Sequence, residues 1–469
     1  MIVTSAVRGK IIDLALQGKL SSRRDTDSNV KQLLDTIIMK NGEEKSISEG
    51  GLPFEIPESW CWIKLGWVMK IDRGGSPRPI KAFITNESNG INWIKIGDVA
   101  KDGKYITETK EKIKQEGEKK SRRVYPGDFL LTNSMSFGRP YISKIEGCIH
   151  DGWLVLRNSE NVFDLDFLYY LLSSNYAYSQ FSQKATGSTV DNLNKEKVAD
   201  AIIPLLPIEE QKRIVERIES IFEVLDRIDV LQDQYSSNQE ALKSKLIEAA
   251  IQGKLTEQLP EDGTAEELIQ SIQKEKQTLV KAGKIKREKT LPEISKDEIP
   301  FDIPTNWKWV RVNDIGSWSS GATPSRSNPS YYTNGTIPWI KTGELNDGVI
   351  VDAEEYITDT AFKESSVRLN PIGSVLIAMY GATIGKVAIL DIEATTNQAC
   401  CACIPIEIDN KYLFYFLKNN KRNFLAASHG GAQPNISKDI ITKSLMPLPP
   451  VKEQKRIVER LDALLNALK

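Results

Sequence analysis

The eight residues EQKRIVER occupy positions 210–217 and recur unchanged at positions 453–460. The match extends towards the N-terminus of both copies, because Pro204 and Pro207 meet prolines at the same shift of 243 residues. A second set of matches, at shifts of 246 to 247 residues, covers the stretch before each copy and includes several tryptophans and glycines. The chain is therefore a duplication.

The order of the repeated segments indicates how the two copies are joined. KIIDLALQGKL at 10–20 corresponds to KLIEAAIQGKL at 245–255, at a shift of 235 residues. In the middle of the chain EQKRIVER leads into the QGKL segment, whereas in the other copy these two pieces stand at opposite ends of the sequence. The duplication is that of a ring cut once, inside one helix, with only the equivalents of 227–235 missing.

Apolar residues with coiled-coil spacing connect the repeated motifs. From Ile214 the apolar positions alternate by four and three residues, pass through polar positions and Tyr235, and resume at Leu242. Such a 4-3 pattern, held over several heptads, is typical of a coiled coil. Residues from Ile457 and from Val7 repeat the pattern, so the two chain ends together are expected to supply the partner helix.

The ends of the central helix can be predicted from its flanking residues. Pro207 disfavours helix before Ile208, and Gly253 supplies a stop signal. We therefore expect a helix of about 40 residues, or roughly 60 Å.

The stretches between the helices mix strand and helix patterns. LVLRN at 154–158 and SVLIAMYG at 374–381 are apolar runs that indicate strands, whereas DFLYYLLSSN at 166–175 and YLFYFLKNN at 412–420 have helical spacing. Each half is therefore expected to be α+β.

These patterns predict an α+β fold with two repeated mixed α/β domains. An antiparallel two-helix coiled coil would hold them apart in a pseudo-two-fold, circular arrangement. The expected segments are an N-terminal helix that completes the second coiled-coil helix (1–20), a connector (21–50), a first globular domain (51–206), a central spacer helix (207–255), a basic connector (256–297), a second globular domain (298–449) and a C-terminal coiled-coil helix (450–469).

Composition narrows the class of protein. The longest apolar runs are too short to span a bilayer and the first residues lack the apolar stretch of a signal peptide, so we expect a cytoplasmic protein with no membrane partner. Five cysteines make no disulfide framework. The net charge of −1 hides two basic stripes, at 110–123 and 274–289, which suit either a polyanion or a solvated surface.

Two motif-like strings do not support catalysis. NPSY at 328–331 lacks the second proline of the motif with which amino-methyltransferases hold a flipped base, and it has no Gly-rich partner loop. GATIGK at 381–386 is one residue short of a phosphate loop, and Val387 stands where a Mg-binding hydroxyl is needed.

Cysteine and histidine are also placed unfavourably for a reaction. Cys400, Cys401 and Cys403 have apolar or basic counterparts in the first half, which favours a buried strand over a metal site. His150 and His429 are the chain's two histidines, and neither is repeated in the other half. We expect no catalytic residue and no metal ligand, and hence a chain that binds rather than catalyses.

The motifs together resemble the DNA specificity (S) subunit of type I restriction-modification systems. The resemblance rests on the EQKRIVER helices, the PLPP lead-in at 447–450, the QGKL ends and the two divergent globules, and it covers essentially the whole chain. It implies that 51–206 and 298–449 are target-recognition domains, each of which reads one half of a bipartite, asymmetric DNA site. The helices between them would set the length of the unread gap.

The same resemblance implies partners and cofactors. The chain would be a non-catalytic subunit that binds double-stranded DNA and directs adenine methylation or restriction by two modification (methyltransferase) subunits and by restriction (ATP-dependent translocase and endonuclease) subunits. No cofactor is expected in this chain, whereas S-adenosylmethionine, ATP and Mg are expected on the partner subunits. Two alternatives stay open: a stand-alone DNA methyltransferase with unrecognised motifs, and a coiled-coil adaptor.

Residues that the two globules share are expected to build the scaffold, and unshared ones to read DNA. Trp60, Trp62, Trp307 and Trp309 repeat at one spacing, which favours packing at the domain entry over base stacking.

Candidate DNA-binding residues are polar or basic and lie on expected loops near Gly-rich turns. Arg and Lys can hold phosphates or guanine edges, and Asn or Gln can pair with adenine. A solvated or structural role is the alternative for each. The candidates are Lys95, Arg122, Arg123, Ser134, Ser136 and Arg139 in the first domain, and Arg326, Lys341, Tyr380, Lys386, Asn397 and Gln398 in the second.

Overall fold

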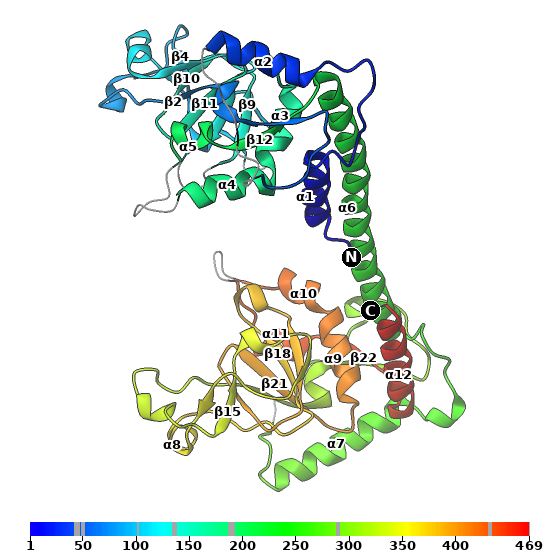
Figure 1. Cartoon of the computed structure of the whole chain (residues 1–469). Coiled ribbons are helices and arrows are strands. Elements are labelled where there is room, and N and C mark those ends of the chain that lie inside the picture. The colour runs from blue at the N-terminus through cyan, green and yellow to red at the C-terminus, as the bar shows by residue number, and fades with distance from the viewer. Residues whose placement is uncertain are drawn as a thin grey trace. The chain divides into compact units, whose positions relative to one another are not determined.

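The chain divides into two compact units, Met1–Gln234 and Tyr235–Lys469 (Figure 1). The computed structural model describes residues 1–41, 47, 52–100, 103–133, 138–185, 193–287, 291–429 and 434–468. Within these ranges no helix is both long enough and apolar enough to cross a membrane.

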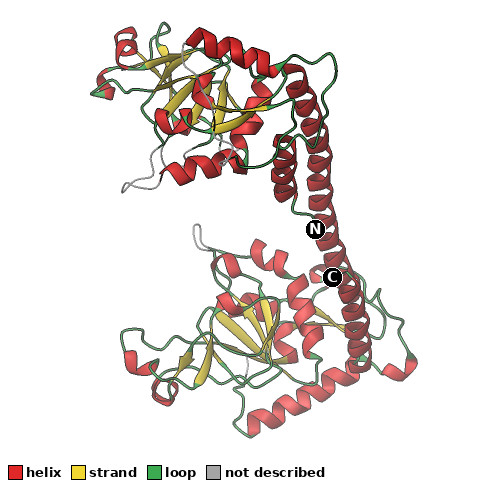
Figure 2. Cartoon of the chain, in the orientation of Figure 1, coloured by secondary structure: helices red, strands yellow, loops and turns green. Residues whose placement is uncertain are grey.

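The first unit combines helices with small mixed sheets (Figure 2). Its helices are α1 (Thr4–Leu16), α2 (Val30–Asn41), α3 (Leu165–Ser173), α4 (Asn175–Ala185), α5 (Lys195–Ala199) and the N-terminal part of α6 (Ile208–Ile251). Its strands are β1 (Cys61–Lys64), β2 (Lys70–Arg73), β3 (Ile84–Thr85), β4 (Ile91–Ile94), β5 (Tyr105–Ile106), β6 (Glu111–Ile113), β7 (Arg122–Val124), β8 (Phe129–Thr132), β9 (Pro140–Ser143), β10 (Gly147–Ile149), β11 (Trp153–Arg157) and β12 (Ile202–Leu205).

The second unit repeats this composition of elements. Besides the C-terminal part of α6, its helices are α7 (Ala265–Lys281), α8 (Asp359–Glu364), α9 (Asn410–Asn419), α10 (Lys421–Ala426), α11 (Lys438–Lys443) and α12 (Val451–Ala467). Its strands are β13 (Lys308–Arg311), β14 (Gly316–Ser320), β15 (Ile337–Ile340), β16 (Gly348–Ile350), β17 (Tyr356–Ile357), β18 (Val375–Ala378), β19 (Val387–Leu390), β20 (Thr395–Thr396), β21 (Cys400–Pro405) and β22 (Leu445–Leu448).

Each unit contains a five-stranded sheet, called here the first sheet, whose strand order and directions are the same in both units. The strand order is β2-β11-β8-β9-β5 in the first unit and β14-β21-β18-β19-β16 in the second. In both, three antiparallel pairings are followed by one parallel pairing. The strands expected at 154–158 and 374–381 are confirmed as β11 and β18, and the two helical patterns as α3 and α9.

The second sheet is where the two units differ. Both contain a parallel pair, β4 with β10 and β15 with β20, and an antiparallel pair, β4 with β6 and β15 with β17. The first unit adds β3 and β7 at the edges, which gives the order β3-β6-β4-β10-β7, whereas the described part of the second unit gives β17-β15-β20. The two units thus share the topology of the first sheet and differ at the edges of the second.

Helix α6 begins and ends where its flanking residues predict. It spans Ile208–Ile251, directly after Pro207 and just before Gly253, which has a left-handed φ of +71°. Gly18, which follows α1, has the same φ. The glycine of each QGKL segment therefore ends a helix, because a Cβ is disfavoured in this backbone conformation.

In the first unit, α1 runs antiparallel to the N-terminal part of α6. Arg8 forms an ion pair with Asp226 at 2.9 Å, and the Gln232 amide bonds both backbone polar groups of Ile2, including its carbonyl at 3.1 Å. As numbers rise along α1, the numbers of its partners on α6 fall.

The second unit shows the equivalent pairing with α12. Leu461 is fully buried in the same apolar cluster as Ile247 and Ala250, and the Gln239 amide donates to the Leu468 carbonyl. Gln232 and Gln239 are one heptad apart, and each binds the backbone at the end of the paired terminal helix.

The expected heptad seam is displaced by one residue at its outer part. Leu242 is 44% exposed, although it is a seam position by spacing. The reason is that the helix ends pack on the globular cores as well as on the paired helix, which turns a neighbouring face inward. The buried residues are Ile12, Ala15 and Leu16 in α1, and their counterparts Ile247, Ala250 and Ile251 in α6.

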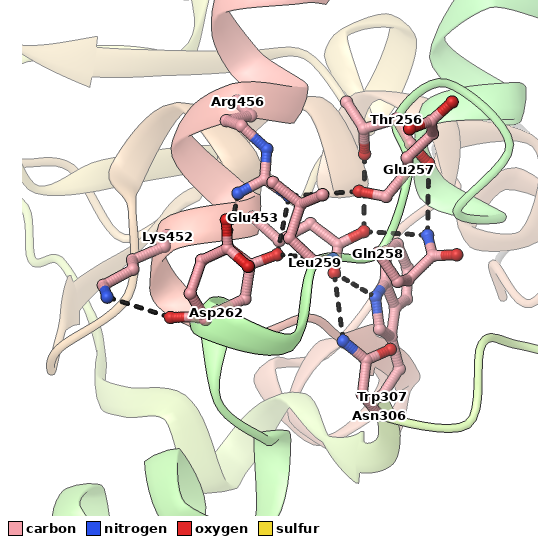
Figure 3. A network of polar contacts seen from close by, with 11 residues as sticks. Thr256, Glu257, Gln258, Leu259, Asp262, Asn306, Trp307, Lys452, Glu453 and Arg456 are labelled. Carbon is pink, nitrogen blue, oxygen red and sulfur yellow. Dashed lines mark hydrogen bonds and ion pairs between the residues drawn. The ribbon is translucent and has the colours of Figure 1, made fainter.

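The repeated EQKRIVER string anchors each long helix to its globular domain, first through its glutamate. Glu210 accepts a hydrogen bond from the Trp60 indole at 3.0 Å, and Glu453 accepts one from the Trp307 indole at 2.8 Å (Figure 3). Both tryptophans are at most 3% exposed, which confirms that they pack at the domain entry. A buried carboxylate is tolerated here because buried donors satisfy it.

The glutamine of the string has its polar atoms satisfied by backbone. Gln211 accepts from Asp164 N at 2.8 Å and donates to the Leu206 carbonyl at 2.9 Å. Gln454 accepts from Asp409 N at 2.9 Å and donates to the Pro449 carbonyl at 2.8 Å. The side chain thus joins the N-cap of α3 or α9 to the start of the long helix.

The arginine of the string forms an ion pair with a buried aspartate of the connector. Arg213 binds Asp27 through two hydrogen bonds of 2.9 and 2.8 Å, and Arg456 binds Asp262 in the same two-pronged way (Figure 3). The side chains of Asp27 and Asp262 are 0% and 1% exposed. The arginine hydrogen bonds hold the pKa of both carboxyl groups below its usual value.

Candidate nucleic-acid interface

Equivalent turns follow β10 and β20, the strands that pair in parallel with β4 and β15 in the second sheet of each unit. Turn 1 (residues 150–152) follows β10, and turn 2 (residues 397–399) follows β20. His150 N donates to the Ile94 carbonyl at the end of β4, and Asn397 N donates to the Ile340 carbonyl at the end of β15, at 3.0 Å in the second case. Because β4 corresponds to β15, His150 and Asn397 occupy the same place in the fold.

A loop passes directly against each turn. These are loop 1 (residues 74–81), after β2, and loop 2 (residues 321–326), after β14. A Cβ on Gly74 would lie 2.1 Å from the His150 carbonyl oxygen, and one on Gly321 would lie 2.2 Å from that of Asn397. Only glycine allows this approach, so the loops begin at a fixed position.

A side-chain hydroxyl ties each loop to its turn. Ser76 Oγ donates to Asp151 Oδ1 at 2.6 Å, and Thr323 Oγ1 donates to Gln398 Oε1. This hydroxyl hydrogen bond lowers the pKa of the Asp151 carboxyl, which is therefore ionised at neutral pH. The Asp151 side chain is 47% exposed and Gln398 is also exposed, so both carry free surface beside the loop.

In the first unit, cationic side chains surround turn 1. Arg78 is 83% exposed and lies 3.6 Å from Asp151. A pocket of about 760 Å³ is lined by Arg78, Lys81 and other residues of loop 1. Trp93, Lys95 and His150 of turn 1 complete its lining. Three cations around one concave surface favour an anionic ligand such as a phosphodiester.

In the second unit, Arg326 is placed by aromatic rings. Its guanidinium lies 4.4 Å from the centre of the Tyr332 ring and 4.8 Å from that of Trp339, and it bonds Glu355 at 2.7 Å. The Trp339 indole donates to the Ala322 carbonyl of loop 2 at 3.0 Å. The candidate Arg326 is thus held next to loop 2 while its side chain stays 52% exposed.

The candidates Lys95 and Lys341 occupy equivalent positions and make equivalent ion pairs. Lys95 pairs with Glu111 of β6 at 2.7 Å, and Lys341 pairs with Glu355, which precedes β17, at 3.1 Å. The Glu355 hydrogen bond raises the pKa of Lys341. Either lysine must exchange its glutamate for a phosphate to bind DNA directly.

The remaining first-domain candidates are spread over edge strand β7 and the connection between β8 and β9. Arg122 is exposed on β7, and Arg123 next to it pairs with Glu146 at 2.5 Å. Arg139 lies half-buried before β9. Ser134 and Ser136 fall outside the described residues.

The remaining second-domain candidates lie around turn 2. Tyr380, 45% exposed, follows Met379, whose N–H donates to the Ala399 carbonyl of turn 2 at 2.8 Å. Lys386 is half-buried at the start of β19. The Met379 bond therefore places Tyr380 one residue from the position that contacts turn 2, the turn that contains Asn397 and Gln398.

Sequence reasoning missed the residues of loop 1 and turn 1. Ser76, Arg78 and Lys81 were not among the candidates, and neither was Asp151. His150 was considered only as an acid or base, and burial in fact lowers its pKa, which leaves it neutral. A shift of 247 residues places His150 on Asn397 and would have found this turn.

Groups suited to catalysis are not evident in the part of the chain that the structure describes. No cluster of His, Cys, Asp or Glu there could hold a metal ion. Cys400, Cys401 and Cys403 are fully buried on β21, as a buried strand predicts, and burial raises the pKa of Cys401 to about 12. The Cys401 thiol is therefore not a nucleophile at neutral pH.

The two halves also match one known protein family. The family model described as "Type I restriction modification DNA specificity domain" matches residues 57–230 and again residues 304–469. The chain belongs to this DNA specificity family. Its role is thereby in DNA sequence specificity, and each unit contains one copy of the specificity domain.

Relatives of the specificity family align along nearly the whole chain. The type I restriction enzyme EcoEI specificity subunit of Escherichia coli is 24% identical over 97% of this chain and 88% of its own length. The crystal structure of an HsdS subunit from Thermoanaerobacter tengcongensis has a TM-score of 0.54 at 20% identity, covering 89% of this chain and 92% of the other.

A second solved structure supports the same fold. It is described as the structural basis of complex assembly and conformational transition of the type I R-M system, and it has a TM-score of 0.60 at 20% identity, with the same coverage. At this identity the likeness shows the fold of a specificity subunit.

Proposed function

We propose that this chain is the non-catalytic DNA-recognition subunit of a type I restriction-modification complex. Each recognition domain, 51–206 and 298–449, reads one half of a bipartite, asymmetric DNA site. The observation that carries this proposal is that turn 1 and turn 2 share one frame but present different side chains. Two recognition domains with the same backbone geometry but different base-contacting side chains can recognise two different half-sites, as an asymmetric site requires.

The spacer in this proposal is α6 with the two terminal helices. Its support is that α1 is antiparallel to the N-terminal part of α6, and α12 to its C-terminal part, with the α1 and α12 contacts ending at Gln232 and Gln239. An antiparallel two-helix coiled coil with pseudo-two-fold symmetry would then set the unread gap between the half-sites, as domain separation sets half-site spacing in other DNA-binding proteins.

The chemistry in this proposal belongs to the partners. Two modification subunits would bind S-adenosylmethionine and methylate adenine, and restriction subunits would use ATP and Mg to move along and cut DNA. The chain's own contribution is to position these subunits on a chosen sequence. The buried thiols of Cys148, Cys400, Cys401 and Cys403 and the neutral, half-buried His150 fit a chain without a reaction of its own.

A domain exchange tests the division of labour. Residues 51–206 are replaced by the same region of a relative, the chimera is assembled with its modification subunits, and the methylated sequences are mapped by long-read sequencing. One half-site should change while the other half-site and the gap stay as before. A change in both half-sites would refute the assignment of one half-site to each domain.

Labelled S-adenosylmethionine separates this proposal from a stand-alone methyltransferase. The purified chain alone should transfer no label to DNA, and label should appear when modification subunits are added. Transfer by the chain alone would overturn the non-catalytic assignment. A chain that protects no DNA even with modification subunits would instead be a coiled-coil adaptor.

A further inference from the structure

We propose that Asp151 and Gln398 are the paired specificity-determining residues of the two recognition domains. Each would contact a base edge in its own half-site, at the same place relative to the protein frame. This inference rests on the proposed function and deepens it, because it names the side chains by which two copies of one frame read different bases.

The equivalence of the two positions follows from several independent contacts. The preceding residues, His150 and Asn397, make the same backbone bond to the end of β4 or β15. Their carbonyls meet Gly74 and Gly321 at nearly the same distance. Asp151 and Gln398 therefore project from matched backbone.

The loop hydroxyls support both side chains in the same manner. Ser76 binds Asp151 and Thr323 binds Gln398, so each side chain is held by its loop at one oxygen. A base-reading group must be held in place by neighbours to discriminate by hydrogen-bond geometry. The hydroxyl contact provides this, and the exposed remainder of each side chain is available to a ligand.

The chemistry differs between the two positions. Ionised Asp151 offers only acceptors, which match an exocyclic amine such as cytosine N4. Arg78, 3.6 Å away, offers donors that match guanine O6 and N7. Together they suit one C·G base pair, with Arg78 on the guanine.

Gln398 offers a different pattern. Its amide carries both a donor and an acceptor, the combination that pairs with adenine N7 and N6. This pattern of the exposed Gln398 amide favours an A·T pair at the position that turn 2 reads.

Neighbouring candidates fit the role less well. Lys95 and Lys341 are the same residue in both domains and make the same ion pair, so they cannot account for a difference between half-sites. The His150 ring lies between the backbone nitrogens of Ile96, at 3.2 Å, and Gly152, at 2.6 Å, and accepts from one of them, because a neutral imidazole has a single acceptor nitrogen. Its nitrogens therefore serve the turn.

Reciprocal substitutions test the inference. Asp151→Gln and Gln398→Asp are made separately in the full chain, each is assembled with modification subunits, and methylation is measured on DNA with randomised half-sites. Asp151→Gln should change the preferred base at one position of the first half-site, from C·G towards A·T. The change in preference should be about 5- to 150-fold, the range for one bidentate base contact.

The expected result of Gln398→Asp is the opposite change in the other half-site. The substitutions are compatible with the backbone, because each residue already occupies this position in one domain. Asp200→Asn, beside Lys64 at the β1 and β12 end, and Gln277→Glu, exposed on α7, are matched controls and should leave both half-sites unchanged.

Several outcomes distinguish this inference from the proposed function. Unchanged base preference in Asp151→Gln and Gln398→Asp, with normal methylation of the original bipartite site, overturns the inference and leaves the proposed function intact. A wild-type complex that methylates no bipartite site overturns both. If Asp151→Gln loses methylation but unfolds at the wild-type midpoint, Asp151→Asn is tested next, because its side-chain oxygen can keep the Ser76 contact. An unchanged base preference in Asp151→Asn then overturns the inference.

Discussion

At the scale of single residues, the repeated EQKRIVER string is explained position by position. Its glutamate accepts a hydrogen bond from a tryptophan indole, and its glutamine accepts one from the backbone N–H of a helix N-cap residue. Its arginine donates two hydrogen bonds to an aspartate of the connector. The lysine faces solvent, the isoleucine and valine enter the core, and the last two residues are exposed. Two buried polar side chains and a partly buried arginine, each with its own hydrogen-bond partners, are difficult to replace one at a time.

Removal of the arginine should be costly. Arg213→Ala removes both arginine hydrogen bonds from Asp27, with 0% side-chain exposure, and leaves it the bond from Arg24 N at 2.6 Å, so the free energy of unfolding should fall by roughly 1–3 kcal/mol. The measurement is a urea titration of the full chain. Lys212→Ala, exposed one residue away, is the control and should change it by less than about 0.5 kcal/mol. A loss below about 1 kcal/mol for Arg213→Ala would contradict the buried-pair argument.

The same ion pair should depend on pH with a defined sign. Arg213 lowers the pKa of Asp27 in the folded state below the usual 3.8, so the pair stabilises the fold at higher pH, and this stability is lost as pH falls through the folded pKa. The stability difference between wild type and Asp27→Asn should therefore be constant near neutrality and shrink below about pH 4. Urea titrations at a series of pH values measure it, and a difference that grows on acidification would be inconsistent with this sign.

At the scale of elements, the QGKL segments end helices, and the site of each unit combines a loop from one sheet with a turn from the other. Gly18 and Gly253 have the same left-handed φ, and each lies against a proline, Pro57 or Pro304, and a tryptophan of the domain entry. The loop-bearing strands β2 and β14 then pair with β11 and β21 in matching register. The end of each helix therefore packs against the entry of its globular domain, and the strand that carries the recognition loop lies a short distance further along the chain.

A Cβ at the helix end should strain the entry. In Gly253→Ala the new atom would lie 2.6 Å from Pro304 Cγ in addition to the cost of φ +71°, so we expect a loss of about 2–3 kcal/mol in unfolding free energy. Gly283 has φ +68° with no atom within 4 Å of an added Cβ, so Gly283→Ala should cost only about 1 kcal/mol. Equal losses in thermal or urea unfolding would show that the proline contact is irrelevant.

At the scale of the whole molecule, the two units share one long helix. Each unit contains its own paired terminal helix, its own anchoring network and its own turn beside a Gly-containing loop. The segment of α6 between Gln232 and Gln239 lies between the last contacts of α1 and α12. It can therefore be altered without touching either recognition frame.

An insertion in this segment tests the proposed spacer. Seven residues placed after Gln234 add about 10 Å of helix, comparable with about three base pairs, and turn it by only about 20°. The unread gap should lengthen while both half-sites keep their bases, as mapped by methylome sequencing with the modification subunits present. Two inserted residues, which rotate the helix by roughly 200°, should abolish methylation. Altered half-site bases after the heptad insertion would contradict the spacer role.

The sequence by itself determined the duplication, the limits of α6, the strand and helix types in the globules, and the family, because repeats, helix stops and apolar periodicity are local signals. Only the tertiary structure decided which polar residues meet. Asp151 is 75 residues from Ser76, and Gln398 is 75 from Thr323, so their hydrogen bonds depend on strand pairing that periodicity does not encode. The buried face of α1 and α6 was likewise set by packing on two surfaces at once, which no single heptad pattern can express.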